Sequence, residues 1–444
     1  MIPFPIDFEN RVKNDSFLSE ELLNALNTDA PTSVRLHPLK TNANLPFESS
    51  IEWCENGFYL KERPSFTLDP LFHAGTYYPQ EAGSMVLDSV LRQLNLPNEP
   101  KILDLCASPG GKSTLIASFL ENKGLLVSNE VINSRAKILR ENLSKWGYSN
   151  VIVTNNDPEH FSKVPDFFDA IVVDAPCSGE GMFRKDPNAR TEWTEDNVQL
   201  CAARQKRIVM DIWDSLKPGG FLIYSTCTFN EDENEKNVEW FVNQLDTQIV
   251  NIQLNSPILK DRNQQGFYCI PGKTATEGFY IAVFQKTGTE TKKQKFTKKN
   301  DLKIQKDALD ATKFADLSSS TLFNWNDKLL AFPSDLISEY LHLQANLHIV
   351  KMGTNIGEIS RKGIIPHEEL ALNPFLRKVD QKINLEKDLA LQFLHGDTFS
   401  ISGPIGFQLI TFENEPLGWI KNIGNRFNNL YPKEWRIRMN LSQK

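Results

Sequence analysis

Residues 98–286 alternate between short apolar runs and amphipathic stretches, and this alternation constrains the fold more than any other feature of the chain. Runs such as 101–105 and 221–225 have the length and composition of buried strands. Segments 134–146 and 197–216 show the apolar spacing of helices. Strands that alternate with helices form a mostly parallel sheet covered by helices on both faces, so we predict an α/β fold for this region.

The rest of the 444-residue chain is predicted to form further units, because this length exceeds one ordinary domain. Residues 1–97 are expected to be mainly helical, with an amphipathic helix at 20–26 and a short strand at 33–36. Residues 287–309 are predicted to be a Lys-rich linker, since the chain around them has eight lysines against two acids. Such a segment is typical of a solvated tether that also attracts phosphate.

Residues 310–444 form the last predicted unit. It is expected to begin with a helix at 329–341, followed by short strands and a hairpin at 410–420. Basic and aromatic residues are interleaved near its end, which suits base stacking combined with phosphate contact. We favour the alternative that most of these aromatic side chains form a small β-core. The residues are Lys421, Arg426, Lys433, Arg436 and Arg438 with Trp419, Phe427, Tyr431 and Trp435.

Composition narrows the class of protein. A net charge of −7 argues against histone-like binding of nucleic acid but is compatible with a local basic groove. The sequence has no apolar run of about 18 residues and no signal-peptide pattern, so we expect a cytoplasmic protein without a membrane partner. The six cysteines are scattered, no CxxC pair occurs and histidines number seven, which predicts reduced thiols and no metal site.

A glycine-rich turn follows the first strand of the α/β region, between Asp104 and Lys112. Glycines at this point let the backbone approach a ligand closely, and the next helix offers free N–H groups to a phosphate or a carboxylate. A P-loop would need glycine at position 106, which is Cys106. Glu130 and Asp157 follow the next two strands, where they could bind the ribose and the adenine of a nucleoside cofactor.

Two further strands each end at a cysteine: Cys177 follows Asp174-Ala-Pro, and Cys227 follows Ser-Thr. Parallel strands bring their carboxyl ends to one edge of a sheet, so these thiols are predicted beside the cofactor crevice. Thiolates are strong nucleophiles, which indicates covalent cysteine chemistry at these two positions. The other cysteines (Cys54, Cys201, Cys269 and, less firmly, Cys106) are interpreted as small buried apolar residues.

These segments closely resemble the Sun-type (Nol/Nop/Sun) RNA cytosine-5 methyltransferases. The resemblance is carried by residues 104–114, 174–187 and 224–235, with family-like N-terminal segments at 34–40 and 72–80. Residues 417–427 and 431–432 resemble the PUA-like end of the bacterial RsmF (YebU) branch, which methylates small-subunit ribosomal RNA. The resemblance implies a Rossmann-like methyltransferase sheet with a C-terminal PUA-like RNA-binding domain. It also implies ribosomal RNA or the small ribosomal subunit as partner, and we expect a monomer.

The resemblance further implies S-adenosylmethionine as cofactor and assigns roles to residues. Cys227 would be the nucleophile, Cys177 would help to release product, and Asp174 would bind the target base. Glu130 would hold the ribose and Asp157 would face the adenine. The full set of cofactor-binding residues is expected to be Cys106, Ala107, Ser108, Pro109, Gly110, Gly111, Lys112, Glu130, Arg135, Asp157 and Asp174.

Covalent catalysis suits cytosine, because its carbon 5 is a poor nucleophile until a thiolate adds at carbon 6. The base must also leave its stack to be reached. Two alternatives remain at this point. A DNA cytosine-5 methyltransferase also uses a Pro-Cys, there as nucleophile, whereas the Thr-Cys strand and the terminal segments favour RNA. A noncatalytic RNA-binding factor for ribosome assembly is disfavoured by the presence of both thiols with Asp174.

Overall fold

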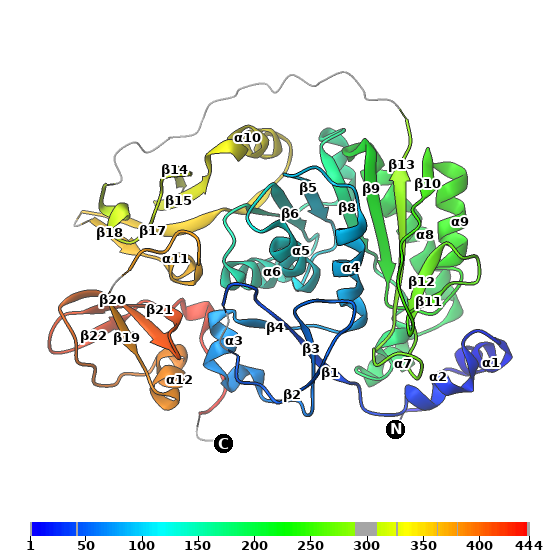
Figure 1. Cartoon of the computed structure of the whole chain (residues 1–444), viewed down its shortest axis with the longest axis horizontal. Helices are drawn as coiled ribbons and strands as arrows, with labels where there is room; N and C mark the ends of the chain where they lie inside the picture. Colours follow the sequence, from blue (N-terminus) through cyan, green and yellow to red (C-terminus); the bar gives the residue numbers. More distant parts are fainter. Residues whose placement is uncertain are drawn as a thin grey trace.

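The computed structural model describes residues 2–40, 43–288, 309–325, 327–361, 363–379 and 381–441. A large mixed sheet runs through the molecule, and smaller sheets lie beside it (Figure 1). The predicted Lys-rich linker falls mainly on residues 289–308, which lie outside the described residues. Among the helices that are described, none combines the length and the apolar composition that a membrane crossing requires.

The middle of the large sheet is parallel, as the alternation of strands and helices predicts. Strands β9, β8, β5, β6 and β7 run parallel in that order, while β13 and β16 join the two sides antiparallel. The bounds are β5 (Lys101–Asp104), β6 (Leu125–Asn129), β7 (Val151–Thr154), β8 (Phe168–Asp174), β9 (Leu216–Thr226), β10 (Thr247–Ile249), β11 (Leu259–Lys260), β12 (Gly266–Cys269), β13 (Phe279–Lys286) and β16 (Ile349–Met352).

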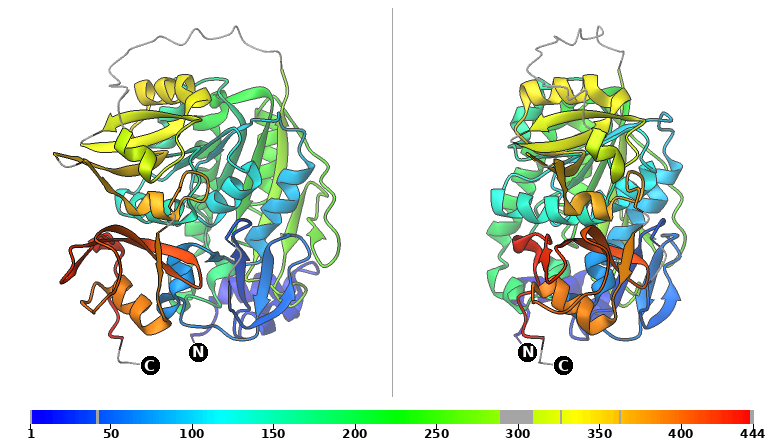
Figure 2. Two further views of the ribbon diagram at one scale, coloured as in Figure 1. Left: turned by 60° about the vertical axis from the view of Figure 1, so that its left-hand side comes forward. Right: turned by 90° about the vertical axis from the view of Figure 1, so that its left-hand side faces the viewer.

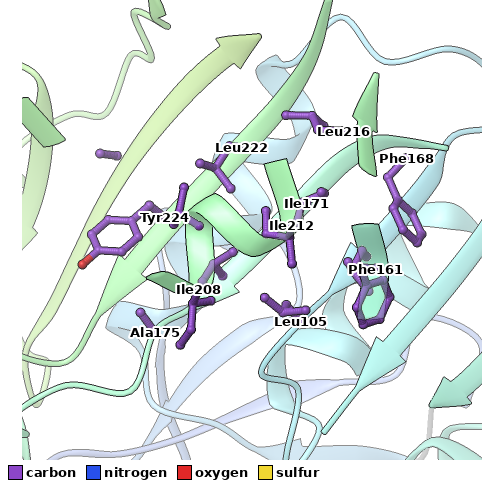
Figure 3. Packing of buried hydrophobic residues seen from close by; sticks show 14 of the residues in the cluster. Leu105, Phe161, Phe168, Ile171, Ala175, Ile208, Ile212, Leu216, Leu222 and Tyr224 are labelled. Carbon is purple, nitrogen blue, oxygen red and sulfur yellow. The ribbon is translucent and has the colours of Figure 1, made fainter. Parts of the chain in front are cut away.

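Helices bury both faces of this sheet, which is why its strands are continuous apolar runs. On one face, Ile208 and Ile212 of α8 pack over Ile171 and Leu222 of the strands (Figure 3). Figure 3 also shows Tyr224 in the same layer. α9 adds to this face, and α4, α5 and α6 cover the other. The helices are α4 (Val86–Gln93), α5 (Gly111–Leu120), α6 (Asn133–Trp146), α7 (Pro187–Glu192), α8 (Glu195–Ile212) and α9 (Glu235–Gln244).

The strand order reverses at β5, and this reversal creates the place for a site. From β5 the chain moves outward to β6 and β7, then returns to form β8 and β9 on the opposite side of β5. The loops that leave β5 and β8 therefore diverge at the carboxyl ends of the strands. Open α/β sheets bind their ligands in the crevice at such a point.

The N-terminal region contains the predicted helix and strand, and it also contains strands that the sequence analysis did not predict. The helix at 20–26 is α2, and the strand at 33–36 is β1. β1 and β3 are the inner strands of an antiparallel sheet with the order β2, β3, β1, β4 (Figure 1, blue). The bounds are α1 (Ile6–Asn14), α2 (Ser19–Ala25), β1 (Thr32–Leu36), β2 (Phe47–Ser50), β3 (Gly57–Leu60), α3 (Pro70–Ala74) and β4 (Tyr77–Pro79).

The predicted helix at 329–341 is wrong in its first half. Residues 328–333 form strand β15, and the helix begins only at Ile337. Pro333 explains the difference, because proline disfavours helix at the residue before it. The strands of this sheet are β14 (Ser320–Trp325), β15 (Lys328–Pro333), β17 (Thr354–Ser360) and β18 (Gly363–Pro366), and the helices beside it are α10 (Ile337–Asn346) and α11 (Glu368–Leu372).

The predicted hairpin at 410–420 is confirmed as β20 and β21. Its turn residues, Glu413 and Asn414, both have positive φ angles, which match the twist of a two-residue hairpin. Trp419, Tyr431 and Trp435 are buried, so the aromatic residues of this tail form a core as favoured above. The remaining elements are β19 (Lys382–Asn384), α12 (Lys387–His395), β20 (Gly406–Phe412), β21 (Glu415–Asn422) and β22 (Phe427–Asn429). Figure 2 shows this sheet (orange to red) below the β14–β18 sheet (yellow).

Candidate active site

A cavity of about 290 Å³ opens at the carboxyl ends of β5, β8 and β9. Residues of the N-terminal region and of β13 close it from the other side. Many of the predicted site residues line this cavity and are thereby brought together, although they lie up to 121 positions apart in the chain. They are Cys106, Ala107, Ser108, Pro109, Gly111, Lys112, Asp174 and Cys227.

The turn between β5 and α5 has the shape that the glycines predict. Gly110 has a φ of +122°, a conformation that side chains rarely adopt, and α5 begins at the next residue. Asp104 lies beneath the turn, fully buried, and accepts a hydrogen bond from Ser113 Oγ at 2.6 Å. Burial raises the pKa of Asp104 to about 7. Asp104 therefore supports the turn, and the free N–H groups of α5 face the cavity end of the sheet.

The predicted ribose and adenine residues lie beside the cavity and do not line it. Glu130 follows β6, accepts a hydrogen bond from Ile132 N at 2.9 Å and lies 3.5 Å from Arg135 Nε. Arg135 in turn donates to the carbonyl of Ser108 at 3.0 Å, so it connects Glu130 to the turn. Asp157 caps the short helix after β7 and lies 4.0 Å from Arg207. Gly110 and Cys177 are likewise outside the lining.

Cys177 and Cys227 lie side by side, with 3.0 Å between their sulfur atoms. The backbone N–H of Cys227 also points to Cys177 Sγ at 3.4 Å. The hydrogen bond with Cys227, together with burial, raises the pKa of the Cys177 thiol well above its ordinary value. Cys177 is thus held as a neutral thiol beside Cys227, and of these two cysteines it is Cys227 that lines the cavity.

The other cysteines behave as predicted, with one difference. Cys54, Cys201 and Cys269 are buried, as expected for small apolar residues. Cys106 is only partly buried and lines the cavity. Burial raises its pKa, so this thiol is also protonated at neutral pH.

Asp174 and Lys112 form an ion pair on the wall of the cavity. Lys112 Nζ lies 2.8 Å from Asp174 Oδ2, and Ser225 Oγ donates to Asp174 Oδ1 at 2.9 Å. Burial lowers the pKa of Lys112, but Asp174 outweighs it, so the pKa lies above its ordinary value. The ammonium group also lies 5.1 Å from the centre of the Phe279 ring. A positive charge, a carboxylate and an aromatic ring therefore meet beside Cys227.

Two buried carboxylates hold the loop that carries Cys177. Glu233 accepts hydrogen bonds from Ser178 N at 3.0 Å and Gln205 Nε2 at 2.8 Å. Glu180 accepts from Phe229 N at 3.0 Å and pairs with Arg11 at 2.5 Å. Burial raises the pKa of Glu233 to about 7.

Sequence reasoning assigned no role to several residues that line the cavity. Tyr78, Gln80 and Glu81 come from the N-terminal region, and Lys185 and Glu277 come from later loops. Glu81 links two walls of the cavity, because its Oε1 accepts hydrogen bonds from Gly83 N at 2.8 Å and Glu277 N at 2.9 Å. The resemblance at residues 72–80 was the one signal that could have pointed to this contribution.

Family models cover most of the chain. A model described as 16S rRNA methyltransferase RsmB/F matches residues 91–285. A model of the N-terminal domain of 16S rRNA methyltransferase RsmF matches residues 4–82, and a model of the methyltransferase RsmF PUA domain matches residues 380–437.

Curated relatives match over nearly their whole length. The ribosomal RNA small subunit methyltransferase F of Pectobacterium carotovorum is 30% identical, covering 97% of this chain and 94% of the relative. The protein of the same name from Escherichia coli O81 is 31% identical, covering 94% and 92%.

Solved structures share the fold. A methyltransferase homologue from Pyrococcus horikoshii matches with a TM-score of 0.56 and 28% identity, over 64% of this chain and 96% of the other. NSun6 from P. horikoshii with SFG, at 21% identity, matches with a TM-score of 0.55 over 65% and 100%.

Proposed function

The chain belongs to the RsmF family of small-subunit ribosomal RNA methyltransferases, and from this premise we propose that it methylates carbon 5 of a cytosine through a covalent adduct with Cys227. Membership makes the protein an S-adenosylmethionine-dependent RNA methyltransferase. The two alternatives, a DNA methyltransferase and a noncatalytic assembly factor, are therefore set aside. The choice of cytosine, of carbon 5 and of the covalent route is our proposal.

The residues of the cavity fit S-adenosylmethionine. The turn at 106–112 lines the cavity and ends at the N-terminus of α5, whose free N–H groups suit a carboxylate. We propose that Glu130 binds the ribose hydroxyls, with Arg135 holding Glu130 against the turn. Asp157, after the next strand, is proposed to face the adenine. When bound, the cofactor supplies an electrophilic methyl group on a sulfonium.

Cys227 is proposed as the nucleophile, and its position supports this role. Cys227 lines the cavity, whereas the partly buried Cys177 lies beside it outside the lining and has a raised pKa that favours the neutral thiol. The Cys227 thiolate adds to carbon 6 of the cytosine, which raises the electron density on carbon 5 so that carbon 5 takes the methyl group. Removal of the carbon 5 proton then expels the thiolate, breaks the sulfur–carbon 6 bond and restores the ring double bond.

Asp174 and Cys177 are proposed to serve the steps on either side of methyl transfer. The Asp174 carboxylate can accept a hydrogen bond from the exocyclic amine of the cytosine, and from ring nitrogen 3 once that nitrogen is protonated as the thiolate adds, while Lys112 keeps the carboxylate in place. Cys177, at 3.0 Å from Cys227, lies close enough to assist departure of the product. The single observation that carries the proposal is this pair of thiols, with Cys227 in the cavity lining and Cys177 3.0 Å away from it.

The product tests the chemistry directly. We expect purified protein, small-subunit ribosomal RNA and labelled S-adenosylmethionine to yield 5-methylcytidine on nucleoside mass spectrometry. Cys227→Ala is expected to abolish transfer while cofactor binding persists, and Cys201→Ala is the matched control because Cys201 is buried away from the cavity. A different methylated nucleoside, or near-normal transfer by Cys227→Ala, would refute the mechanism.

The release role of Cys177 has its own test. Cys177→Ala is expected to accumulate a covalent protein–RNA adduct that migrates slowly on a denaturing gel, because departure of the thiolate is impaired. The adduct must vanish in the Cys177→Ala, Cys227→Ala double variant. Full methylation without any adduct would remove Cys177 from this step.

We also expect the enzyme to act as a cytoplasmic monomer, which light scattering and cell fractionation can check.

A further inference from the structure

A second cavity, of about 200 Å³, lies where α6, the β14–β18 sheet and the C-terminal end of the chain meet. Its walls come from Arg140 of α6, from Trp325 and Lys328 of the sheet, and from Trp435 in the short helix Lys433–Trp435. None of the residues that line it also lines the catalytic cavity. The two cavities are therefore separate sites.

The walls combine aromatic rings with positive charge. Trp325 is half-buried, and Trp435 is buried. Arg140 and Lys328 have no ion-pair partner within the described ranges of the chain, so their charges are available to a ligand. Arginine and lysine beside accessible aromatic rings, here the half-buried Trp325, are the groups that proteins use to contact the phosphates and stack the bases of single-stranded RNA.

The acidic residues of this cavity leave a net positive charge, because Arg140, Lys328 and Lys351 outnumber Glu369 and Glu434. Glu369 is paired internally, with Lys351 Nζ at 2.6 Å. Burial opposes its ionisation, but Lys351 outweighs burial and lowers the pKa of Glu369 to about 2. Glu434 is exposed to solvent.

A buried hydrogen-bond acceptor also lies in the wall. Asn355 is 4% exposed, and its Oδ1 has no partner among the residues that the structure describes. Buried polar atoms in folded proteins are almost always hydrogen-bonded, so an unpaired acceptor in a cavity wall indicates a donor that arrives with a ligand. The exocyclic amine of adenine, cytosine or guanine is such a donor.

We propose that this cavity binds an unpaired nucleobase of the ribosomal RNA substrate, stacked on Trp325, with Arg140 and Lys328 contacting its flanking phosphates. The proposal rests on the RNA substrate of the proposed function. The position of the cavity supports the proposal, because Arg140 lies five residues after Arg135, and Arg135 contacts the turn between β5 and α5. That spacing is about 7.5 Å along α6. Helix α6 therefore connects the second cavity to the turn that lines the catalytic cavity.

Variants of Trp325 and Lys328, which line the second cavity, test the proposal without disturbing the catalytic residues. Trp325→Ala is expected to raise the Kd for protein-free small-subunit ribosomal RNA by roughly 5- to 100-fold, the range for loss of one stacked base. The KM for RNA should rise in parallel, while kcat and cofactor affinity stay within about twofold, and Trp325→Phe should restore most of the affinity because it keeps a stacking ring.

Lys328→Glu gives a second, independent variant, because Lys328 is exposed and its replacement does not threaten folding. It is expected to weaken RNA binding and to reduce the salt dependence of binding by about one phosphate contact. Lys260→Glu is the matched control, since Lys260 is an exposed lysine in β11 at the opposite edge of the large sheet. Its Kd should stay near that of the wild type.

Unchanged Kd and KM in both Trp325→Ala and Lys328→Glu, with RNA methylation intact in the wild type, would overturn the inference and leave the proposed function standing. Failure of the wild type to methylate RNA would instead contradict the proposed function. Adenosine and cytidine monophosphates distinguish an RNA subsite from a mononucleotide site. They should bind far more weakly than RNA, and a Kd equal to that of RNA would also overturn the inference.

Discussion

At the scale of the residue, Asp174 joins the two walls of the catalytic cavity through Lys112 and Ser225. Asp174→Asn keeps the shape of the side chain but leaves the buried Lys112 ammonium without its carboxylate. We expect the single-turnover rate to fall about 10²- to 10³-fold, the usual cost of losing one preorganised electrostatic contact. Measurement at saturating cofactor isolates the chemical step. A rate within a few-fold of the wild type would show that this charge is dispensable.

The raised pKa of Glu233 predicts that the stability of the protein depends on pH. Its pKa is raised to about 7 by burial, so the stability it contributes is fully present below about pH 4.5 and is lost as the pH rises through 7. Glu233→Gln keeps an oxygen to accept from Ser178 N and cannot ionise. We therefore expect this variant to exceed the wild type in unfolding free energy at pH 8 by on the order of 1–3 kcal/mol.

Denaturant titrations at pH 5 and pH 8 check this expectation. Asp104 has a similarly raised pKa, but it is present in both proteins and drops out of the difference. Glu231→Gln is the control, because Glu231 is exposed and only pairs with Lys236. Equal pH dependence in Glu233→Gln and the wild type would show that Glu233 is ionised throughout this range.

At the scale of the element, α1 stabilises a loop that lies some 170 residues away. Arg11 of α1 pairs with the buried Glu180, which fixes the loop behind Cys177. Arg11→Met leaves Glu180 with fewer donors, and we expect a loss of about 1–3 kcal/mol of stability, since Arg11 is partly exposed. A lower kcat with unchanged cofactor affinity should accompany it.

Lys13→Met is the matched control on the same helix. Lys13 pairs with Glu9 on the surface, where solvent screens an i,i+4 ion pair and its contribution to stability is small. Thermal melts and steady-state kinetics of the two variants separate the effects. Equal melting temperatures in both variants would mean that α1 does not support the loop.

Local pattern determines which elements the sequence could predict. The strands of the large sheet are buried on both faces, so β8 and the second half of β9, residues 221–226, are recognisable as buried runs. The small N-terminal sheet is harder to predict from the sequence, because β2 is mostly exposed and β4 has only three residues. β15 was mistaken for helix because four consecutive buried residues satisfy either periodicity.

The residues of the site also divide into those that local sequence pattern identifies and those that it does not. The glycine turn and both cysteines lie at strand ends, so spacing alone brings them to one edge. Glu130 and Asp157 have the predicted spacing, but their side chains are engaged with Arg135 and Arg207 beside the cavity. Glu81 reaches the cavity from outside the α/β region by tertiary packing, which no local pattern encodes.

At the scale of the whole molecule, the predicted units share their cores. β16, from the C-terminal part, pairs with β7 and completes the large sheet. Phe332, Tyr340 and Leu343 belong to the same apolar cluster as the strands of that sheet. Another cluster joins N-terminal residues such as Val34 to Ile420 of the last sheet. The predicted boundaries therefore mark changes in sequence pattern. Whether each predicted unit folds on its own needs a separate test.

Residues 1–288 expressed alone answer that question. Without β16, the edge of β7 loses its partner strand, and the apolar surface beneath α10 becomes exposed. We expect this fragment to aggregate or to melt well below the intact chain, as measured by size-exclusion chromatography and thermal scanning. Coexpression with residues 309–444 should restore solubility, because the missing strand and helix are then supplied in trans. A monodisperse fragment with the melting temperature of the full chain would contradict the shared core and establish 1–288 as an independent unit.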